Sequence, residues 1–541
     1  MRTFFFTLLL IPVSFSILAQ SANNKPKLVV GIVIDQMRQD YLWRYYDRYA
    51  DDGFKRILTQ GFQFKNAHYN YNGTLTGPGH ASIYTGTTPS RHGIIGNDWY
   101  DREAGTKVNC VGDPGVKPLG GSGKGQGVSP HRMEVTTVTD ELSIFTNHRA
   151  KVVGVSYKDR GATLPAGHNP TGAYWYDGAT GEFVTSTYFR TALPDWLIAF
   201  NNLQLPKKYV QQHWEPLYPI ETYTSSIDDD NPYEHARWRK ETPTFPYDLS
   251  GDRNPYGSFY GSPFANTVLT ELALAALEGE KMGTDAITDF LTISYSSTDS
   301  EGHAVGPRAV EIEDMYLRLD RDLAHLMQEL DQKVGKDGYV LFISADHGVV
   351  DNSRYLVDHK YPAGRFGDSL IQVVREKVQR KYGEGEWFLD LNASEIFLNR
   401  PLIKYRGIDL AEIQTFTADC LMEFPFVSEV FTATALAQRN ITDPFIQLVQ
   451  NGYNTKRSGD VMMVMKSGFL YGKPHDKGTT HGTPYTYDTH IPILFYGAGI
   501  PAGFSVRKVA ITDIAPTVSM LLEIPLPSGA TGTPLLELFE Q

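Results

Sequence analysis

The sequence predicts an α/β protein with a mostly parallel central sheet sandwiched by helices, interrupted by two large insertions. Short apolar, β-branched runs alternate along the chain with helical patterns, which is typical of buried parallel strands covered on both faces. Two long segments break this alternation. The 541-residue chain is 41% hydrophobic and 21% charged, an ordinary globular composition that excludes a disordered or fibrous protein.

The predicted elements follow one another in a regular order. Residues 27–34 (KLVVGIVI) indicate the first buried strand. Further strands are expected at 151–156, 289–295, 339–344, 460–465 and 491–496. Helical patterns occupy 40–49, 53–58, 135–145, 310–334 and 514–522, and a Gly-Pro-Gly turn at 77–79 opens a short helix.

The two insertions cover about 165–262 and 352–455. The first is rich in Tyr, Trp, Pro, Asn and Asp, and the second holds helices and short strands of its own. We interpret both as insertions into one catalytic domain of residues 20–541, since no repeat is visible in the sequence. A monomer is expected.

The amino terminus has the features of a secretory signal peptide. Arg2 precedes an apolar run from Phe4 to Leu18, and Ala19 offers a small residue for cleavage, so residues 1–19 are expected to be removed. A membrane anchor is the weaker alternative, because a spanning helix needs about 20 apolar residues. The mature chain is therefore expected to be periplasmic or secreted, with no stable membrane anchor.

Net charge and cysteine content argue against several classes of protein. The net charge is −12, from 50 basic against 62 acidic residues, which argues against a nucleic-acid partner. Two cysteines, Cys110 and Cys420, are too few for a cysteine-based zinc site or a disulfide framework, and the sequence leaves open whether they pair.

Carboxylates and imidazoles gather where predicted strands end. Asp35 follows the first strand, the 299–303 segment (DSEGH) follows the third, Asp346-His347-Gly348 follows the fourth, and His481 lies in a Gly-flanked loop. Functional groups of open α/β sheets collect at the carboxyl edge of the strands, and Asp and His are zinc ligands. Any one of these residues has a simpler explanation as a cap or turn residue, but together they predict a metal centre.

Thr76 stands before the Gly-Pro-Gly turn, in the stretch NGTLTGPGHAS. A hydroxyl there can face an anion that the free N–H groups of the helix hold, although Thr76 alone could equally be an N-cap. We interpret His80 as structural, since it falls inside this helix. His475 and His490 flank His481 and are interpreted as bystanders.

The pattern resembles the alkaline phosphatase superfamily. It consists of Asp35, TLTGPGH with Thr76, Asp299-x-x-x-His303, Asp346-His347-Gly348 and GTTHGTP with His481. With Asn97 and Lys158-Asp-Arg160 added, it is similar to the PafA-type alkaline phosphatases. The resemblance implies an alkaline-phosphatase-like fold with two Zn2+, one held by Asp35, Asp346, His347 and Thr76, the other by Asp299, His303 and His481.

The resemblance also implies a mechanism. The first zinc would activate Thr76, which attacks phosphorus to form a covalent phosphothreonine, and the second would stabilise the leaving oxygen and later supply hydroxide. Asn97, Lys158 and Arg160 would bind the phosphate oxygens. Lys158 and Arg160 would share one face if the preceding strand continues that far.

Charge balance favours phosphate monoesters as substrates. Two zinc ions balance Asp35, Asp299, Asp346 and a Thr76 alkoxide, which leaves Lys158 and Arg160 to match a dianion. A phosphodiesterase or nucleotide pyrophosphatase of the same superfamily is the first alternative. A non-catalytic exported metal- or phosphate-binding protein is the second. A sulfatase is disfavoured, because that class converts Cys or Ser at the position that Thr76 holds.

Overall fold

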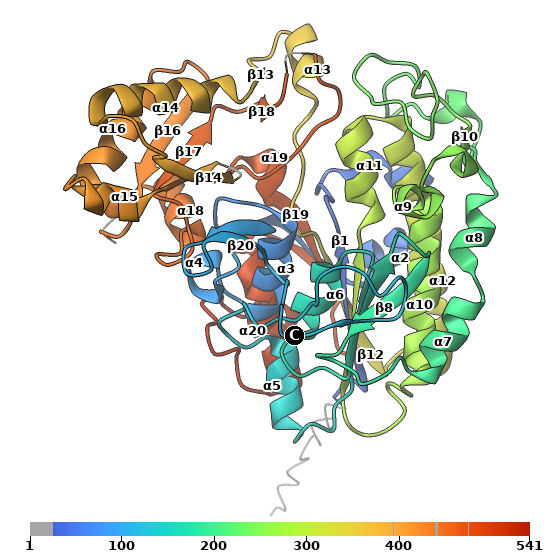
Figure 1. Cartoon of the computed structure of the whole chain (residues 1–541). Helices are drawn as coiled ribbons and strands as arrows, with labels where there is room; N and C mark the ends of the chain where they lie inside the picture. The colour runs from blue at the N-terminus through green and yellow to red at the C-terminus, as the bar shows by residue number, and fades with distance from the viewer. Residues whose placement is uncertain (1–24, 393, 439–441, 474, 541) are drawn as a thin grey trace, which may run out of the picture.

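The structure is a computed structural model that describes residues 25–392, 394–438, 442–473 and 475–540 (Figure 1). These residues form a ten-stranded sheet at the centre of the molecule. Its strands lie in the order β20 (Gly503–Ala510), β2 (Phe62–His68), β19 (His490–Gly497), β12 (Tyr339–Ser344), β1 (Leu28–Ile34), β11 (Asp289–Tyr295), β6 (Val152–Ser156), β7 (Gly172–Asp177), β8 (Glu182–Ser186) and β5 (Pro118–Leu119).

The middle of this sheet is parallel and fully buried. All seven residues of β1 are buried, as a Val- and Ile-rich run without alternation predicts. The strand pairs in parallel with β11 on one side and β12 on the other. The expected α/β class is confirmed, but the sheet is mixed, because β19 and β8 run antiparallel to both of their neighbours.

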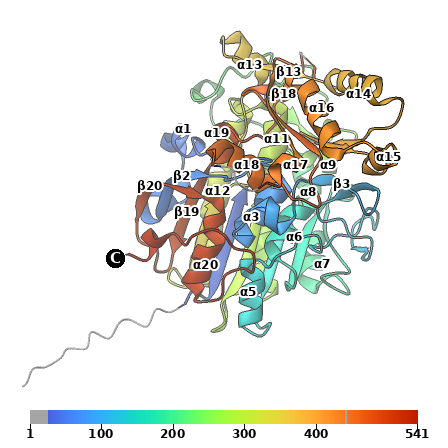
Figure 2. The ribbon, with the colours of Figure 1, turned by 90° about the vertical axis from the view of Figure 1, so that its left-hand side faces the viewer.

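Two groups of helices cover the sheet, and Figure 1 shows them on opposite sides of β1; in Figure 2, α3, α5 and α20 of one group lie in front. Members of each group pack on one another and on the strands beneath them. One group comprises α2 (Phe54–Gln60), α7 (Asp195–Asn202), α10 (Pro263–Gly279), α11 (Ser297–Val305) and α12 (Val310–Lys333). The other comprises α3 (Thr76–Thr85), α5 (Val138–Phe145), α6 (Asp159–Ala166) and α20 (Ile514–Leu522).

The predicted segment 165–262 remains close to the main sheet. Its strands β7 and β8 extend that sheet, and its buried aromatic residues Trp214 and Tyr247 belong to the main hydrophobic core. The segment also contains α8 (Leu205–Val210), α9 (Pro255–Phe259) and the two-residue strands β9 (His213–Trp214) and β10 (Tyr247–Asp248).

The second insertion and the strand that follows it form a separate four-stranded sheet in the order β14 (Phe388–Asn392), β15 (Glu395–Leu398), β17 (Val461–Met465) and β16 (Val427–Thr432). Its own hydrophobic core includes Trp387 and Ile413, under α14 (Ser369–Tyr382) and α16 (Leu410–Met422). The strand expected at 460–465 exists, but it lies in this smaller sheet. The domain boundaries themselves stay a prediction.

The other α-helices and β-strands are short. They are α1 (Tyr41–Arg44), α4 (Pro89–His92), α13 (Ser353–Asp358), α15 (Arg400–Tyr405), α17 (Ala433–Leu436), α18 (Pro444–Gly452), α19 (Thr486–Thr489), the hairpin β3 (Asp98–Asp101) with β4 (Thr106–Asn109), and the parallel pair β13 (Gly364–Phe366) with β18 (Phe469–Tyr471).

The structure also bears on membrane-spanning helices and on the two cysteines, but not on the predicted signal peptide. The predicted signal peptide, residues 1–19, lies outside the described residues. Within the part of the chain that the structure describes, no helix combines the length and apolarity that crossing a membrane requires. Cys110 and Cys420 are both buried and free.

Candidate active site

The candidate residues converge because three neighbouring parallel strands end at one edge. Asp35 follows β1, Asp299 lies in α11 just after β11, and Asp346 and His347 follow β12. Since β11, β1 and β12 are adjacent and in register, their carboxyl ends meet. His481 arrives from a loop far along the chain.

Two groups of potential metal ligands result. Ligand atoms of Asp35, Asp346 and His347 lie within 4.8 Å of one another, and so do those of Asp299, His347 and His481. The two groups share His347, whose ring stacks on that of His481 with centroids 3.4 Å apart. His303 joins the second group through Nε2, 3.1 Å from Asp299 Oδ1.

Each of the three histidines is oriented by its own Nδ1. That atom lies 2.9 Å from Thr479 O in His303, 2.9 Å from Gly348 O in His347, and 2.7 Å from Thr74 O in His481. A carbonyl oxygen can only accept, so Nδ1 carries the proton. In the neutral ring Nε2 then faces the site with its lone pair, which is the usual arrangement of a metal-binding histidine.

Several atoms of the first group lack any hydrogen-bond partner among the described residues. Asp35 Oδ1, Asp346 Oδ2 and His347 Nε2 are all buried in this way. Unpaired buried carboxylate oxygens are costly, and the free energy is recovered when a cation binds between them. The donor set of carboxylates and imidazoles therefore fits a metal ion such as zinc.

Lys158 is the cation that lies between the two groups. Its Nζ is 2.6 Å from Asp35 Oδ2 and 2.6 Å from Asp299 Oδ2, and its side chain is 10% exposed. Burial would lower the pKa of Lys158, but the charges of Asp299 and Asp35 outweigh that effect and raise it. The lysine is thus held in its charged form.

The neighbouring charges shift the pKa values of two of the carboxyl groups in opposite directions. Burial, together with the charge of Asp35, raises the pKa of Asp346 well above its usual range. Burial acts in the same sense on Asp299, but the charges of His303 and Lys158 hold its pKa well below the usual range. Opposite shifts among adjacent groups are characteristic of functional sites.

Thr76 is the first residue of α3, and its hydroxyl is not used as a cap. Leu75 holds the N-cap position without a side-chain hydrogen bond. Thr76 is 1% exposed, and its Oγ1 lies 3.4 Å from Lys158 Nζ. Gly79 allows α3 to lie close against the backbone of Asp346, since a Cβ atom there would lie 2.3 Å from Asp346 O.

Asn97 and Arg160 border the same site. Asn97 Oδ1 accepts a hydrogen bond of 2.8 Å from the Gly77 N–H, which leaves its amide N–H groups available. The condition that would place Lys158 and Arg160 on one face of a strand is not met, because β6 ends at Ser156. Lys158 is instead the N-cap of α6, and Arg160 lies in its first turn.

Gln36 was missed by the sequence reasoning. Its backbone N–H donates to Asp346 Oδ1 at 3.1 Å, and its Nε2 donates to Asp299 Oδ1 at 2.6 Å. It therefore ties together carboxylates from both ligand groups. Its φ of 65° places it in the left-handed region, and no local pattern in the sequence reveals that turn.

Tyr260 was also missed. Its hydroxyl is buried and without a hydrogen-bond partner among the described residues. Burial raises its pKa, and the charges of Lys158, Asp299, Asp35 and Arg160 act on it, so it borders the same site. Its ring stacks on Tyr157 with centroids 5.6 Å apart.

The three histidines interpreted as structural or as bystanders have other surroundings. His80 Nδ1 lies 2.8 Å from Thr76 O, its Nε2 lies 2.8 Å from Ser294 Oγ, and burial lowers its pKa to about 4. His490 Nε2 lies 3.0 Å from Lys65 O, and its ring stacks on His68. His475 is exposed.

Comparison with known proteins identifies the family. The sequence model of type I phosphodiesterase / nucleotide pyrophosphatase matches residues 29–487. Alkaline phosphatase PafA from Elizabethkingia meningoseptica is 45% identical over 526 residues, covering 96% of both chains. Alkaline phosphatase PhoV from Synechococcus elongatus is 43% identical over 520 residues, covering 95% of this chain and 93% of that one.

The fold agrees with these sequence relationships. The crystal structure of wild-type PafA superposes with a TM-score of 0.92 at 44% identity, covering 95% of this chain and 99% of that one. The chain therefore belongs to the alkaline phosphatase superfamily as a PafA-type alkaline phosphatase, a hydrolase of phosphate monoesters.

Proposed function

We propose that the enzyme hydrolyses phosphate monoesters with two zinc ions and with Thr76 as nucleophile, through a covalent phosphothreonine. The position of Thr76 Oγ1 carries this proposal. It lies 3.4 Å from the Lys158 ammonium, which itself contacts Asp35 and Asp299, one from each ligand group.

The ligands divide as Asp35, Asp346, His347 and Thr76 for one zinc and Asp299, His303 and His481 for the other. Zinc bound there supplies positive charge that favours the deprotonated forms of the Thr76 hydroxyl and of the departing alcohol. The unpaired atoms Asp35 Oδ1, Asp346 Oδ2 and His347 Nε2 support this assignment.

The chain's own groups bind and orient the phosphate. The Asn97 amide, the Lys158 ammonium and the Arg160 guanidinium donate to its non-bridging oxygens, with the two cations matching the dianion. The deprotonated Thr76 oxygen then forms a bond to phosphorus while the bond to the ester oxygen breaks. Water attacks phosphothreonine in the second step and releases inorganic phosphate with Thr76 restored.

Export completes the proposal. Residues 1–19 direct the chain out of the cytoplasm and are removed, so the mature enzyme works as a periplasmic or secreted monomer on small phosphate esters. Amino-terminal sequencing of the secreted protein tests the cleavage, and sedimentation tests the monomer.

Substitution of Thr76 tests the nucleophile. We expect Thr76→Ala to lower kcat/KM for p-nitrophenyl phosphate by at least about 10³-fold, since water must then attack unaided. Thr76→Ser retains a hydroxyl and is the matched control. Mass spectrometry of acid-quenched enzyme should find one added phosphoryl group on the Thr76 peptide of the parent and none in Thr76→Ala.

Retention of full activity by a zinc-loaded Thr76→Ala variant would contradict covalent catalysis by this residue. It would favour direct attack by water instead. Zinc content is measured on both variants, so that loss of metal is not mistaken for loss of the nucleophile.

A further inference from the structure

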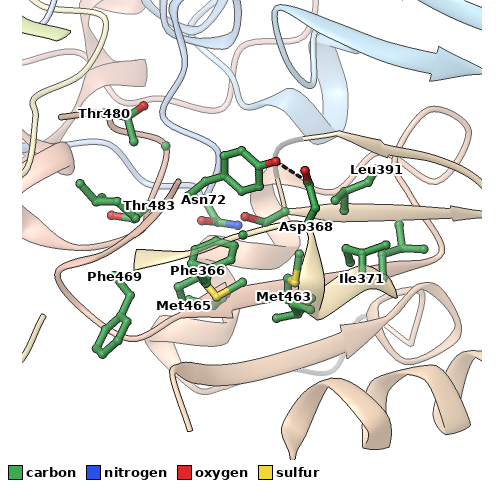
Figure 3. A pocket seen from close by; sticks show the side chains of 18 of the residues that line it. Asn72, Phe366, Asp368, Ile371, Leu391, Met463, Met465, Phe469, Thr480 and Thr483 are labelled. Carbon is green, nitrogen blue, oxygen red and sulfur yellow. Dashed lines mark hydrogen bonds between the residues drawn. The ribbon is translucent and has the colours of Figure 1, made fainter. Parts of the chain in front are cut away.

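A cavity of about 660 Å³ lies between the catalytic sheet and the four-stranded sheet (Figure 3). This volume is in the range of small-molecule sites. Most of the wall comes from the four-stranded sheet and the elements beside it, that is from β13, α14, β14, β15, β17 and β18. The rest comes from the loop before α3 and from the loop that carries His481.

The cavity borders the proposed catalytic centre. Leu75, which precedes the proposed nucleophile, and His481, a proposed zinc ligand, are both part of its wall. The ligand group to which His481 belongs is the one assigned to the departing ester oxygen. The cavity therefore begins where the alcohol part of a bound ester has to lie.

The wall is apolar and adaptable. Met463 and Met465 face the same side of β17, as alternate residues of a strand must, and Figure 3 shows both sulfur-containing side chains at the cavity. Flexible methionines accommodate ligands of varied shape and contact aromatic rings favourably. The other apolar side chains include Phe366, Ile371, Leu391 and Phe469.

The charged groups of the wall disfavour an anionic alcohol. Asp368 accepts a hydrogen bond from the Tyr471 hydroxyl, drawn as a dashed line in Figure 3. Asp390 contributes a buried oxygen without a partner among the described residues. Against these two carboxylates stands Arg375, whose guanidinium covers the Phe388 ring at 5.5 Å.

We propose that this cavity binds the alcohol part of the substrate and selects phosphate monoesters of uncharged, apolar aryl or long-chain alkyl alcohols. The inference rests on the proposed function and adds the substrate class. Sugar bisphosphates and nucleoside polyphosphates fit poorly, because they would place further negative charge or many unpaired hydroxyls against this wall.

Two substrates of matched chemistry provide the test. The leaving groups of 4-methylphenyl phosphate and 4-pentylphenyl phosphate have nearly equal acidity and differ by four methylenes. Burial of each methylene is worth up to roughly fourfold in affinity. We expect kcat/KM to be at least about tenfold higher for the pentyl ester, mainly through a lower KM.

Ile371→Trp fills the cavity from α14, and Val373→Trp is its matched control on the same helix. Val373 is 38% exposed and does not border the cavity. We expect Ile371→Trp to reduce the preference for the pentyl ester to within about twofold while hydrolysis of the methyl ester continues. Val373→Trp should retain the preference, and thermal unfolding verifies that both variants fold.

A second pair of variants makes the cavity wall more polar instead of filling the cavity. Met463→Gln places an amide in the cavity, whereas Met462→Gln alters the opposite face of β17, which packs in a different hydrophobic cluster. Only Met463→Gln should weaken the pentyl preference.

Equal kcat/KM for the two esters in the parent enzyme would overturn the inference while leaving the proposed function intact. So would an undiminished preference in Ile371→Trp, which would point to another cavity, of about 340 Å³ and bordered by Lys158, Trp175 and Tyr176. Failure to hydrolyse either ester would overturn the proposed function. Calorimetric binding of 4-pentylphenol to the parent and to Ile371→Trp would then test the cavity alone, with binding lost only in the variant as the supporting result.

Discussion

Lys158 would compete with the proposed zinc ions for the same carboxylates, and this makes Lys158→Met the most informative substitution. The ammonium lies 2.6 Å from an oxygen of Asp35 and 2.6 Å from an oxygen of Asp299, whose side chains are 0% and 6% exposed. At this separation, with an effective dielectric constant of about 20, each pair has a gross attraction of roughly 6 kcal/mol. Desolvation of the three charges offsets most of it.

Lys158→Met should lower the free energy of unfolding of the metal-free protein substantially. Removing one partner of a buried ion pair costs about 3–5 kcal/mol, because the other charge is left unpaired. With an unfolding entropy of about 2.1 cal/mol/K per residue, this lowers Tm by roughly 3–5 °C for a chain of this length. In the zinc-bound protein the metal ions pair with both carboxylates, so the cost falls to that of a surface pair, at most about 1 kcal/mol.

The difference between the two states appears as zinc affinity. A substitution that destabilises the metal-free form about 3 kcal/mol more than the zinc-bound form tightens zinc binding about 100-fold. Competition with a chromophoric chelator measures this affinity, and calorimetry with and without chelator measures Tm. Lys55→Met is the control, since Lys55 pairs with Asp51, whose side chain is 96% exposed, at 3.8 Å. Equal or weaker zinc binding by Lys158→Met would refute the reasoning.

Three further predictions concern charge and metal. Arg160→Ala should lower kcat/KM for p-nitrophenyl phosphate by at least about tenfold more than for bis-p-nitrophenyl phosphate, because the dianion depends more on a second cation; an equal loss in both assays would argue against that role. Chelation should reduce hydrolysis to the background rate and zinc should restore it, whereas manganese as the better activator would reject the choice of metal. Burial would lower the pKa of His303, but the charge of Asp299 and their hydrogen bond raise it to about 9. A raised folded-state pKa adds stability below the unfolded value of about 6.5 that is lost as pH rises through 9. Urea unfolding of the metal-free protein should therefore show stability falling across this window, and an unchanged slope in His303→Gln would contradict the assignment.

The sequence predicts the strands of the central sheet well, because burial on both faces requires an unbroken apolar run. The strand at 339–344 has the predicted bounds, and β1 begins one residue later than the predicted 27–34. The strand at 460–465 was located correctly along the chain but assigned to the wrong sheet. Nothing in five or six apolar residues specifies which neighbours they pair with.

In the candidate site, too, the sequence predicts the local features and not those that depend on the three-dimensional arrangement. Asp35, Asp299 and Asp346 could be proposed from sequence because a strand end is a local feature and parallel neighbours align those ends. Gln36 could not, because its role depends on a left-handed turn that brings its amide between two carboxylates. The strand expected at 151–156 ends at Ser156 as predicted, so Lys158 and Arg160 lie beyond it, at the start of α6.

Phosphoryl transfer and selection of the alcohol, which many enzymes combine in one set of loops, are assigned here to two different parts of the fold. Every proposed ligand and the proposed nucleophile belong to the ten-stranded framework or its loops, whereas most of the cavity wall belongs to a module with an independent interior. Sequence drift in that module can retune which alcohols enter without disturbing phosphoryl chemistry. Exchanging residues 364–472 for the corresponding module of another superfamily member would therefore transplant selectivity and leave the nucleophile at work.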